Sequence, residues 1–457
     1  MPLIVKDYLS CDHIIESSVA VADARTDYFV KPGDTVCLAP GSRGALAIRN
    51  FQGAPDNPIT LTNFGGQVVI DSDTSHGILF QNSRFFRLTG SGASDIAYGI
   101  RIVDSVGTGV RVGYKSSDFE IDHVEVSGVD GAGISAKSKA VCSDGSSNNY
   151  DYDADGKELG DLDDVVNRDN FTQYDFAFHD NYIHDVGSEG LYVGSSFYQE
   201  GRDLNCDSGP ETAYDPIIKG VNVYDNIVTN TGWDGIQVGS ATKKCNIHHN
   251  VIVGDSRKDR SDQQSGVMNN PGSVCNIYNN FVKDGGGPGI YVQGNGGNVI
   301  YNNVIVNAGR DEPVGNNGGD GIAVMRGSNP GNSIYVLNNT IITPKNFGIK
   351  FPSDQGSDSR IQNNIIVAPG NYDSYGEEAY IQTWGLESTT ISNNLTGQTL
   401  AGMRFVNPAL HDYSIGAGSP AVDSGIDCGL DMAVRDYVGV PRPQGTGYDI
   451  GAYEFVP

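Results

Sequence analysis

Positive charge is scarce in this sequence. Its 457 residues include 30 Lys and Arg against 56 Asp and Glu, which gives a formal net charge of −26 at pH 7. Nucleic-acid binding requires a basic surface, so this composition argues against a nucleic-acid partner. An acidic polymer would be repelled as well, unless cations bridge it to the protein.

Several other features are missing. No stretch reaches the ~18 apolar residues that cross a membrane, so we predict no membrane span. The spacing Cys-x-x-Cys, typical of metal sites, does not occur. The first ten residues, MPLIVKDYLS, do not have the pattern of a signal peptide, yet the acidic composition indicates a secreted or cell-surface protein.

A repeat dominates the stretch from Cys245 to Asn303. Short apolar strands alternate with turns, and Asn250, Asn280 and Asn303 hold equivalent places at steps of 30 and 23 residues. A period of ~20–30 residues without a helical pattern indicates a solenoid in which each repeat forms one coil. The 60 glycines fit such a succession of turns.

Two columns extend this register along the chain. Asparagines at the same place in other repeats are Asn181, Asn226, Asn339, Asn363 and one of Asn393 or Asn394. Glycines open a Gly-φ-x-φ strand in each repeat, as in Gly235-Ile236-Gln237-Val238. Strand alternation predicts that Ile236 and Val238 point inward and Gln237 outward. Stacked asparagines suit a tight corner that recurs in every coil.

Residues 55–400 resemble the right-handed parallel β-helix superfamily that includes pectate lyases. The resemblance implies an all-β, single-stranded right-handed parallel β-helix; it does not fix the reaction, since the superfamily holds lyases, hydrolases, epimerases and adhesins. The phrases GSPAVDSG and YDIGAYEF resemble a closing module found after secreted bacterial β-helices. We therefore expect an N-terminal cap with a first irregular coil (1–54), a β-helix (55–399) and a C-terminal capping module (400–457).

Two insertions, 139–174 and 197–218, leave the predicted helix at the same edge. The first contains Asp151, Asp153 and Asp155 followed by Gly156, which resembles the start of an EF-hand calcium loop. Leu162 stands where that loop needs a bidentate Glu. The alternatives are therefore a calcium ion held by the three aspartates, or a solvated acidic loop.

The seven cysteines suggest different states. Cys245 and Cys275 occupy equivalent places in neighbouring coils, and we expect them to stack inside as free thiols. Cys142 and Cys206 lie in the two insertions and are predicted to form a disulfide in a secreted protein. Cys11 and Cys37 are predicted to form a further disulfide.

A pair of carboxylates precedes two column glycines. Glu189 and Asp234 fall in consecutive coils, which stack about 4.8 Å apart, so both are expected to face one groove. Such a pair can act as acid and nucleophile in sugar hydrolysis, or as calcium ligands. The alternative is two solvated turn residues.

Around this pair, outward-facing side chains could bind a sugar. Aromatic rings suited to stacking are Tyr192, Tyr198, Trp233 and Tyr291, and polar or charged candidates are Gln237, Arg326 and Lys350. Lys137, one coil from Glu189, is our preferred base for proton abstraction. Packing beneath a loop is the competing interpretation of each aromatic ring.

Three functions remain open on these residues. The first is a secreted, calcium-assisted polysaccharide lyase acting by β-elimination on a uronate polymer, with Lys137, Glu189 and Asp234 as catalytic residues. The second is a glycoside hydrolase that uses Glu189 and Asp234. The third is a carbohydrate-binding surface protein without catalysis.

Overall fold

The computed structural model describes residues 10–144, 166–258, 260–310, 318–325, 332–352, 358–384, 389–430 and 433–457. The chain divides into two compact units, one made of Met1–Gly187 with Gly201–Pro216 and one of Ser188–Glu200 with Ile217–Pro457. We call them unit 1 and unit 2. The predicted calcium loop at Asp151, Asp153 and Asp155 and the predicted binding residue Arg326 lie outside the described residues.

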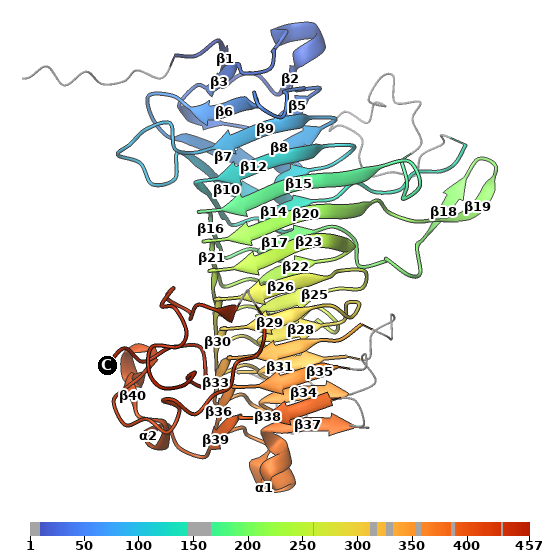
Figure 1. The fold of residues 1–457 in the computed structure, drawn as a ribbon. Coiled ribbons are helices and arrows are strands. Elements are labelled where there is room, and N and C mark those ends of the chain that lie inside the picture. The colour runs from blue at the N-terminus through green and yellow to red at the C-terminus, as the bar shows by residue number, and fades with distance from the viewer. Residues whose placement is uncertain are drawn as a thin grey trace, which may run out of the picture. The chain divides into compact units, whose positions relative to one another are not determined.

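In unit 1 each coil gives one strand to each of three parallel sheets, named A, B and C (Figure 1). Sheet A contains β1 (His13–Ile15), β3 (Thr35–Leu38), β6 (Ile59–Asn63), β9 (Arg84–Thr89), β12 (Ser117–Asp122) and β15 (Thr172–His179). Sheet B contains β2 (Val21–Asp23), β5 (Leu46–Arg49), β8 (His76–Gln81), β11 (Thr108–Val112) and β14 (Ile134–Ala136). Sheet C contains β4 (Gly41–Arg43), β7 (Val68–Ser72), β10 (Ile100–Ser105), β13 (Val124–Ser127) and β16 (Tyr182–His184).

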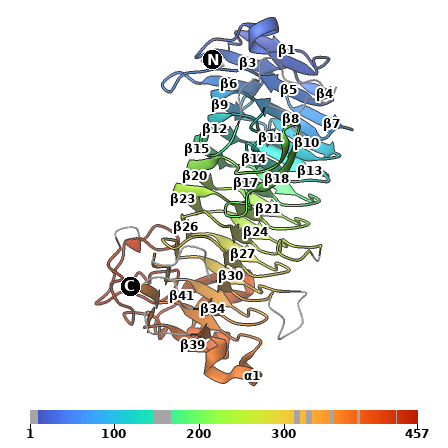
Figure 2. The same cartoon turned by 90° about the vertical axis from the view of Figure 1, so that its right-hand side faces the viewer.

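Unit 2 repeats the same three sheets (Figure 2). Sheet A contains β20 (Ile217–Tyr224), β23 (Ala241–His248), β26 (Cys275–Tyr278), β29 (Val299–Tyr301), β32 (Tyr335–Leu337), β35 (Ser359–Gln362) and β38 (Thr389–Ser392). Sheet B contains β17 (Leu191–Val193), β22 (Ile236–Val238), β25 (Val267–Asn269), β28 (Ile290–Val292), β31 (Ile322–Val324), β34 (Ile349–Pro352) and β37 (Ile381–Trp384). Sheet C contains β21 (Ile227–Thr229), β24 (Val251–Val253), β27 (Phe281–Lys283), β30 (Val304–Val306), β33 (Thr340–Ile342), β36 (Ile365–Val367) and β39 (Leu395–Gly397).

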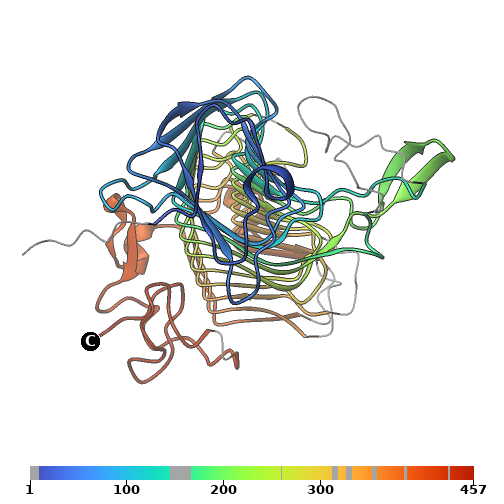
Figure 3. The ribbon, with the colours of Figure 1, turned by 90° about the horizontal axis from the view of Figure 1, so that it is seen from above.

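Both units therefore have the predicted fold, a right-handed parallel β-helix. Seen from above, the coils of each unit superpose (Figure 3). An antiparallel hairpin, β18 (Arg202–Cys206) with β19 (Gly209–Ala213), stands out from the coils of unit 1. The short helical elements are η1 (Ala24–Tyr28), α1 (Tyr372–Tyr375), η2 (Gly376–Ala379), α2 (Leu400–Met403) and η3 (Pro408–Leu410). No helix among the described residues is long and apolar enough to cross a membrane.

The core follows the predicted alternation. Ile236 and Val238 of β22 are fully buried, and so are Ile290 and Val292 of β28 to within 1%. The glycine before each strand has a steric reason, because a Cβ on Gly235 would lie 2.5 Å from the Cγ2 atom of Ile252. Any side chain there would push sheet C away from sheet B.

The asparagine column forms a continuous hydrogen-bonded ladder in unit 2. Each side-chain amide donates to the next side-chain oxygen at 2.9–3.0 Å, through Asn226, Asn250, Asn280, Asn303, Asn339, Asn364 and Asn394. The register therefore selects Asn364, where the sequence predicted Asn363. Asn363 is the preceding corner residue and has left-handed backbone, with φ of 56°.

Three disulfides are present. Cys142–Cys206 and Cys11–Cys37 confirm the predicted pairs. The prediction of free thiols at Cys245 and Cys275 was wrong, because these residues are bonded. They are direct partners on β23 and β26, with Cα atoms 4.4 Å apart, so stacked inward side chains meet at bonding distance.

Residues at both ends of the chain pack on the coils of their own units. Residues 10–54 supply β1–β5, which join the sheets of unit 1. In unit 2, β40 (Phe405–Asn407) and β41 (Asp412–Ile415) pair with each other, and their buried Phe405, Tyr413 and Ile415 lie against Val304, Ile342 and Ile365 on the flank of sheet C. The predicted role as a cap over the last coil stays a prediction.

Candidate functional site

Cations gather on the outer surface of sheet B in unit 1. Arg111 of β11 is aligned with Leu79 of β8 and Ser135 of β14, while the neighbouring residues in each strand are buried in the core. The same alternation, continued past β14, turns Lys137 and Lys139 outward. We call this surface the basic face and define it by Arg49, Arg111, Lys137, Lys139 and Arg202.

On the basic face, Lys139 has a strongly lowered side-chain pKa. Burial lowers the pKa of its ammonium group to about 7, and the positive charges of Arg111, Lys137 and Arg202 act in the same direction. The carboxylate of Asp215 offsets part of this effect. The side chain stays partly exposed, so at neutral pH a large fraction of Lys139 is an uncharged amine within reach of a ligand.

Asp215 holds the two insertions together beside Lys139. This buried carboxylate accepts a hydrogen bond from the backbone N–H of Ala140 (2.7 Å) and an ion-pair contact from Arg202 Nε (2.6 Å). The Cys142–Cys206 disulfide adds a covalent link between the same insertions. Lys139 therefore sits at the root of an insertion that is fixed by a hydrogen bond, an ion pair and a disulfide.

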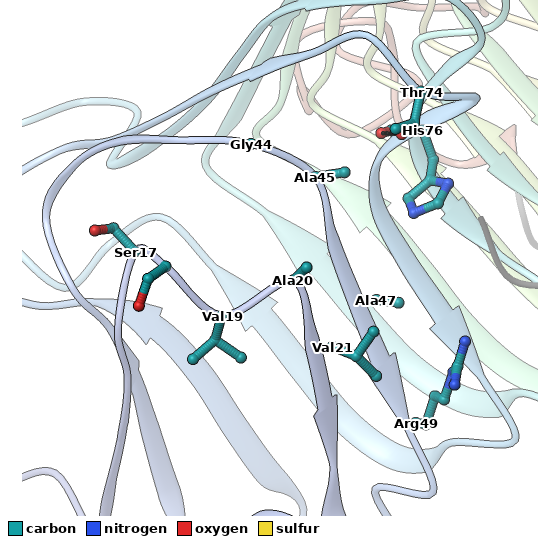
Figure 4. A pocket seen from close by; sticks show the side chains of 11 residues that line it. Ser17, Val19, Ala20, Val21, Gly44, Ala45, Ala47, Arg49, Thr74 and His76 are labelled. Carbon is teal, nitrogen blue, oxygen red and sulfur yellow. Dashed lines mark hydrogen bonds between the residues drawn. The ribbon is translucent and has the colours of Figure 1, made fainter. Parts of the chain in front are cut away.

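A cavity of about 490 Å³ lies at the other end of the basic face (Figure 4). Arg49 and His76 line one side, and the segment from Ser17 to Val21 lines the opposite side. Burial, together with the charges of Arg111 and Arg49, lowers the pKa of His76 to about 4. His76 is therefore neutral at pH 7, and Arg49 supplies the positive charge at the cavity wall.

In unit 2 the predicted carboxylate pair is brought together as expected. The N–H of Gly190 donates to the carbonyl of Asp234, which sets Glu189 and Asp234 side by side in adjacent coils. The side-chain amide of Gln237 is oriented so that its nitrogen donates to Glu189 Oε1 (3.0 Å) and Asp234 Oδ2 (3.1 Å). Its oxygen accepts hydrogen bonds from Ser196 and Asn270.

These carboxylates are enclosed rather than exposed in a groove. Glu189 is 1% exposed and Asp234 is fully buried. Burial, the charge of Glu189 and the charge of Asp255 all raise the pKa of Asp234 well above its usual value. Asp255 is buried too, neither of its oxygens has a hydrogen-bond partner among the described residues, and burial raises its pKa to about 8.

The predicted sugar-binding column is in register but mostly covered. Tyr192, Gln237, Tyr291 and Lys350 share one outward column of sheet B in unit 2, with Met268 and Ala323 between them. Tyr192 and Tyr291 are half-buried, and Gln237 is buried.

The two remaining aromatic candidates are occupied by protein contacts. The guanidinium of Arg260 lies 4.1 Å from the centre of the Trp233 ring. Tyr198 packs on Gly272, where an added Cβ would come within 2.3 Å of the ring. Lys350 lies near Asp320, whose pKa is raised to about 7 by burial.

A possible metal-binding cluster lies in unit 1, where ligand atoms of Glu120, Asp122 and His179 come within 4.8 Å of one another. Calcium fits it poorly. An imidazole is one of the three ligands, and Arg87 Nε already contacts Glu120 (3.1 Å) and Asp122 (2.8 Å). A second group in the described part of the chain contains Cys142 and Cys206, whose sulfurs are bonded to each other.

The candidate site residues that the sequence analysis did not single out are Arg49, His76, Arg111, Lys139 and Arg202. A signal existed for two of them. The outward column that begins at Ser135 reaches Arg111 when it is extended by one coil, and strand alternation carries Lys137 on to Lys139. No sequence motif near Arg202 identifies it, because it lies on the β18–β19 hairpin and approaches Lys139 only in the folded structure.

No protein-family model matches the chain, and no curated protein matches it in sequence. Among solved structures, pectate lyase Pel9A shares 13% identity, with 98% of this chain and 97% of that chain covered and a TM-score of 0.49.

Two further solved structures are of enzymes whose names state other reactions. The GH136 lacto-N-biosidase from Eubacterium ramulus shares 11% identity over 81% of this chain and 63% of its own, with a TM-score of 0.45. The A-module of Azotobacter vinelandii mannuronan C-5 epimerase AlgE4 shares 13% over 80% of this chain and 87% of its own, with a TM-score of 0.41. The names cover three reactions, so the function has to be argued from the site.

Proposed function

We propose that this protein is a secreted polysaccharide lyase that cleaves a uronate-containing polymer by β-elimination, with Lys139 as the base. The observation that carries the proposal is a partly exposed lysine with a pKa of about 7 among three further cations. A base works best when its pKa lies near the working pH, and lysines reach that range through burial and like charges. The three disulfides support an extracellular setting.

The reaction assigns one task to each group. The neutral amine of Lys139 takes the proton from the carbon next to the uronate carboxylate. The electron pair of that C–H bond forms a double bond to the neighbouring ring carbon, and the bond from that carbon to the glycosidic oxygen breaks. The leaving oxygen receives a proton from the Lys139 ammonium, so the amine is regenerated and no redox partner is required.

Charge on the uronate carboxylate must be neutralised while the proton leaves. Arg111 is the group suited to this task, because it lies beside Lys139 and a guanidinium can pair with a carboxylate through two hydrogen bonds. In this proposal Arg111 neutralises the uronate carboxylate, which is the role that the sequence analysis gave to calcium. It also explains how a protein of net charge −26 can hold a polyanion.

A panel of polysaccharides read in two ways tests the proposal. Elimination creates a double bond conjugated to a carboxylate, which absorbs in the ultraviolet, whereas hydrolysis only adds reducing ends. We expect ultraviolet absorbance on at least one uronate polymer, with the rate unchanged by chelator. Reducing ends without absorbance, or no product on any uronate polymer, would contradict elimination.

Hydrolysis by Glu189 and Asp234 is the second candidate. The observation in its favour is that Asp234 has a strongly raised pKa next to Glu189 in the adjacent coil. One protonated and one ionised carboxyl group is the arrangement used by glycosidases. Their enclosure weighs against it, since a substrate would have to displace Gln237 and the groups around it.

A further inference from the structure

We propose that the cavity between Arg49, His76 and the Ser17–Val21 segment is a subsite for the terminal uronate of the polymer, so that cleavage proceeds from a chain end. This inference rests on the proposed function, because it assumes that the basic face carries a uronate chain. It adds a ligand and a mode of action to a part of unit 1 that the elimination step itself does not use.

The cavity lies in line with the basic face. Ala47 of β5, on the cavity floor, is aligned with Leu79, which is aligned with Arg111, which is aligned with Ser135. Three strand spacings separate Ala47 from Ser135, or roughly 14 Å. A chain that passes Lys139 and Arg111 toward the N-terminal end of sheet B therefore arrives at Arg49 and His76.

The loop before β2 forms one wall of the cavity at that end. Among residues 10–144, β2 is the last strand of sheet B in this direction. The loop that precedes β2, Ser17–Ala20, faces Arg49 and His76 across the cavity (Figure 4). The turn at Gly44 and Ala45 forms a further part of the lining. A polymer that follows sheet B in this direction meets the Ser17–Ala20 loop, and its end fits beside that loop better than the middle of a chain.

The lining suits a sugar acid. Arg49 can pair with a carboxylate, and the hydroxyl groups of Ser17, Ser18 and Thr74 can bond to sugar hydroxyls. Val19 and Val21 offer apolar surface to the ring, and Val21 is 40% exposed at present. An uncharged His76, whose Nδ1 contacts Ser75 Oγ (3.3 Å), can offer its Nε2 without a second full charge at the wall.

Binding of a single sugar tests the cavity without catalysis. D-galacturonate and D-glucuronate would be titrated by calorimetry, with D-galactose as the neutral probe. We expect a uronate to bind at least tenfold more tightly than D-galactose, and Arg49→Gln to remove that preference. Arg25→Gln, an exposed arginine of η1, is the matched control and should change nothing. Equal binding of both sugars, or unchanged uronate binding in Arg49→Gln, overturns the assignment.

Product length tests the mode of action. A chain end held in the cavity fixes the distance to Lys139, so early products should have one size. Ala45→Trp, which fills the cavity from a partly exposed turn, should broaden the product sizes while circular dichroism shows an intact fold. A broad ladder of early products from the unaltered protein overturns the inference but leaves elimination standing. Uronate binding that depends on Arg49, without elimination on any polymer, would instead retain the subsite and reject the proposed function.

Discussion

Sheet B carries opposite chemistry in the two units. In unit 1 its outer surface presents cations, and Lys139 is partly exposed with a pKa of about 7. In unit 2 the turns that lead into strands of sheet B hold Glu189, Asp234 and Asp255, all enclosed, with the pKa of both aspartates raised. The backbone is the same in both, so side chains and covering loops alone make the difference.

Burial acts on both sets in the same way, because it disfavours the charged form. For a lysine this lowers the pKa into the neutral range, and partial exposure leaves the amine reachable. For an aspartate it raises the pKa, and complete enclosure keeps the proton away from any substrate. The comparison therefore separates a reactive surface from a buried polar interior, and four experiments test that difference.

Replacing Lys139 should have the largest effect. Lys139→Ala removes the proposed base, and general-base catalysis contributes ~10²–10⁴-fold, so elimination should fall by about a thousandfold. The measurement is the initial rate of ultraviolet absorbance on the best polymer. Lys31→Ala, an exposed lysine of unit 1, is the control and should retain the full rate. A loss of less than tenfold in Lys139→Ala would move the base elsewhere.

The pH dependence should follow the same amine. Only neutral Lys139 accepts a proton, so the rate should rise about tenfold per pH unit below 7 and level off above. Lys137→Ala removes a like charge that lowers this pKa, so the midpoint should move to higher pH. Rate profiles from pH 5 to 9 measure both. An unmoved midpoint with a lost plateau would instead identify Lys137 as the base.

Asp255→Asn should alter stability in unit 2. Burial raises the pKa of Asp255 from 3.8 to about 8, so the folded state holds a proton that the unfolded state releases between those values. Stability should therefore fall as pH rises from about 4 to about 8, with a slope of up to about 1.4 kcal/mol per pH unit.

The Asn variant cannot ionise, so its unfolding free energy should lose that part of the slope. Urea unfolding at pH 5, 6.5 and 8 compares the two proteins. Asp262→Asn, at an exposed residue of the same unit, should keep the slope of the unaltered protein. Identical slopes for Asp255→Asn would mean that the carboxylate is ionised in the folded state.

The smallest effect is expected from the enclosed pair. Glu189→Gln and Asp234→Asn keep the side-chain shape, and neither group contacts substrate in elimination, so both rates should stay within about twofold. A hundredfold loss in either variant, with reducing ends as product, would establish hydrolysis and reverse the comparison.

The coil architecture was predictable because it repeats. Glycine spacing and apolar alternation predicted the inward positions of Ile236 and Val238 correctly. The corner asparagines were harder, since Asn363-Asn364 offers two candidates and only the backbone register selects the second. Stacking of Cys245 on Cys275 was also predicted. The bond between them depends on the distance of 4.4 Å between their Cα atoms, which the sequence alone does not give.

The sequence predicted only those features of the candidate site that follow from a residue's position in the repeat. Column positions placed Glu189 beside Asp234, yet enclosure by Gln237, Ser196 and Asn270 is a tertiary effect. Lys137 was selected because it was expected one coil from Glu189 and beside both insertions. Lys139 was passed over, because its low pKa arises from burial in the folded structure and from charges that include Arg111 and Arg202, which stand 28 residues before it and 63 residues after it.

The Cys245–Cys275 bond has a mechanical consequence. A solenoid pulled from its two ends peels coil by coil, and each released residue lengthens the chain by about 3.5 Å. The bond encloses a sequence separation of 30 residues, so that coil can unfold without lengthening the tether. Of the length that the three disulfides withhold in a stretching experiment, roughly 100 Å should come from this bond, and adding a reductant should restore it along with the length held by the other two bonds, while the force needed to open the remaining coils stays the same.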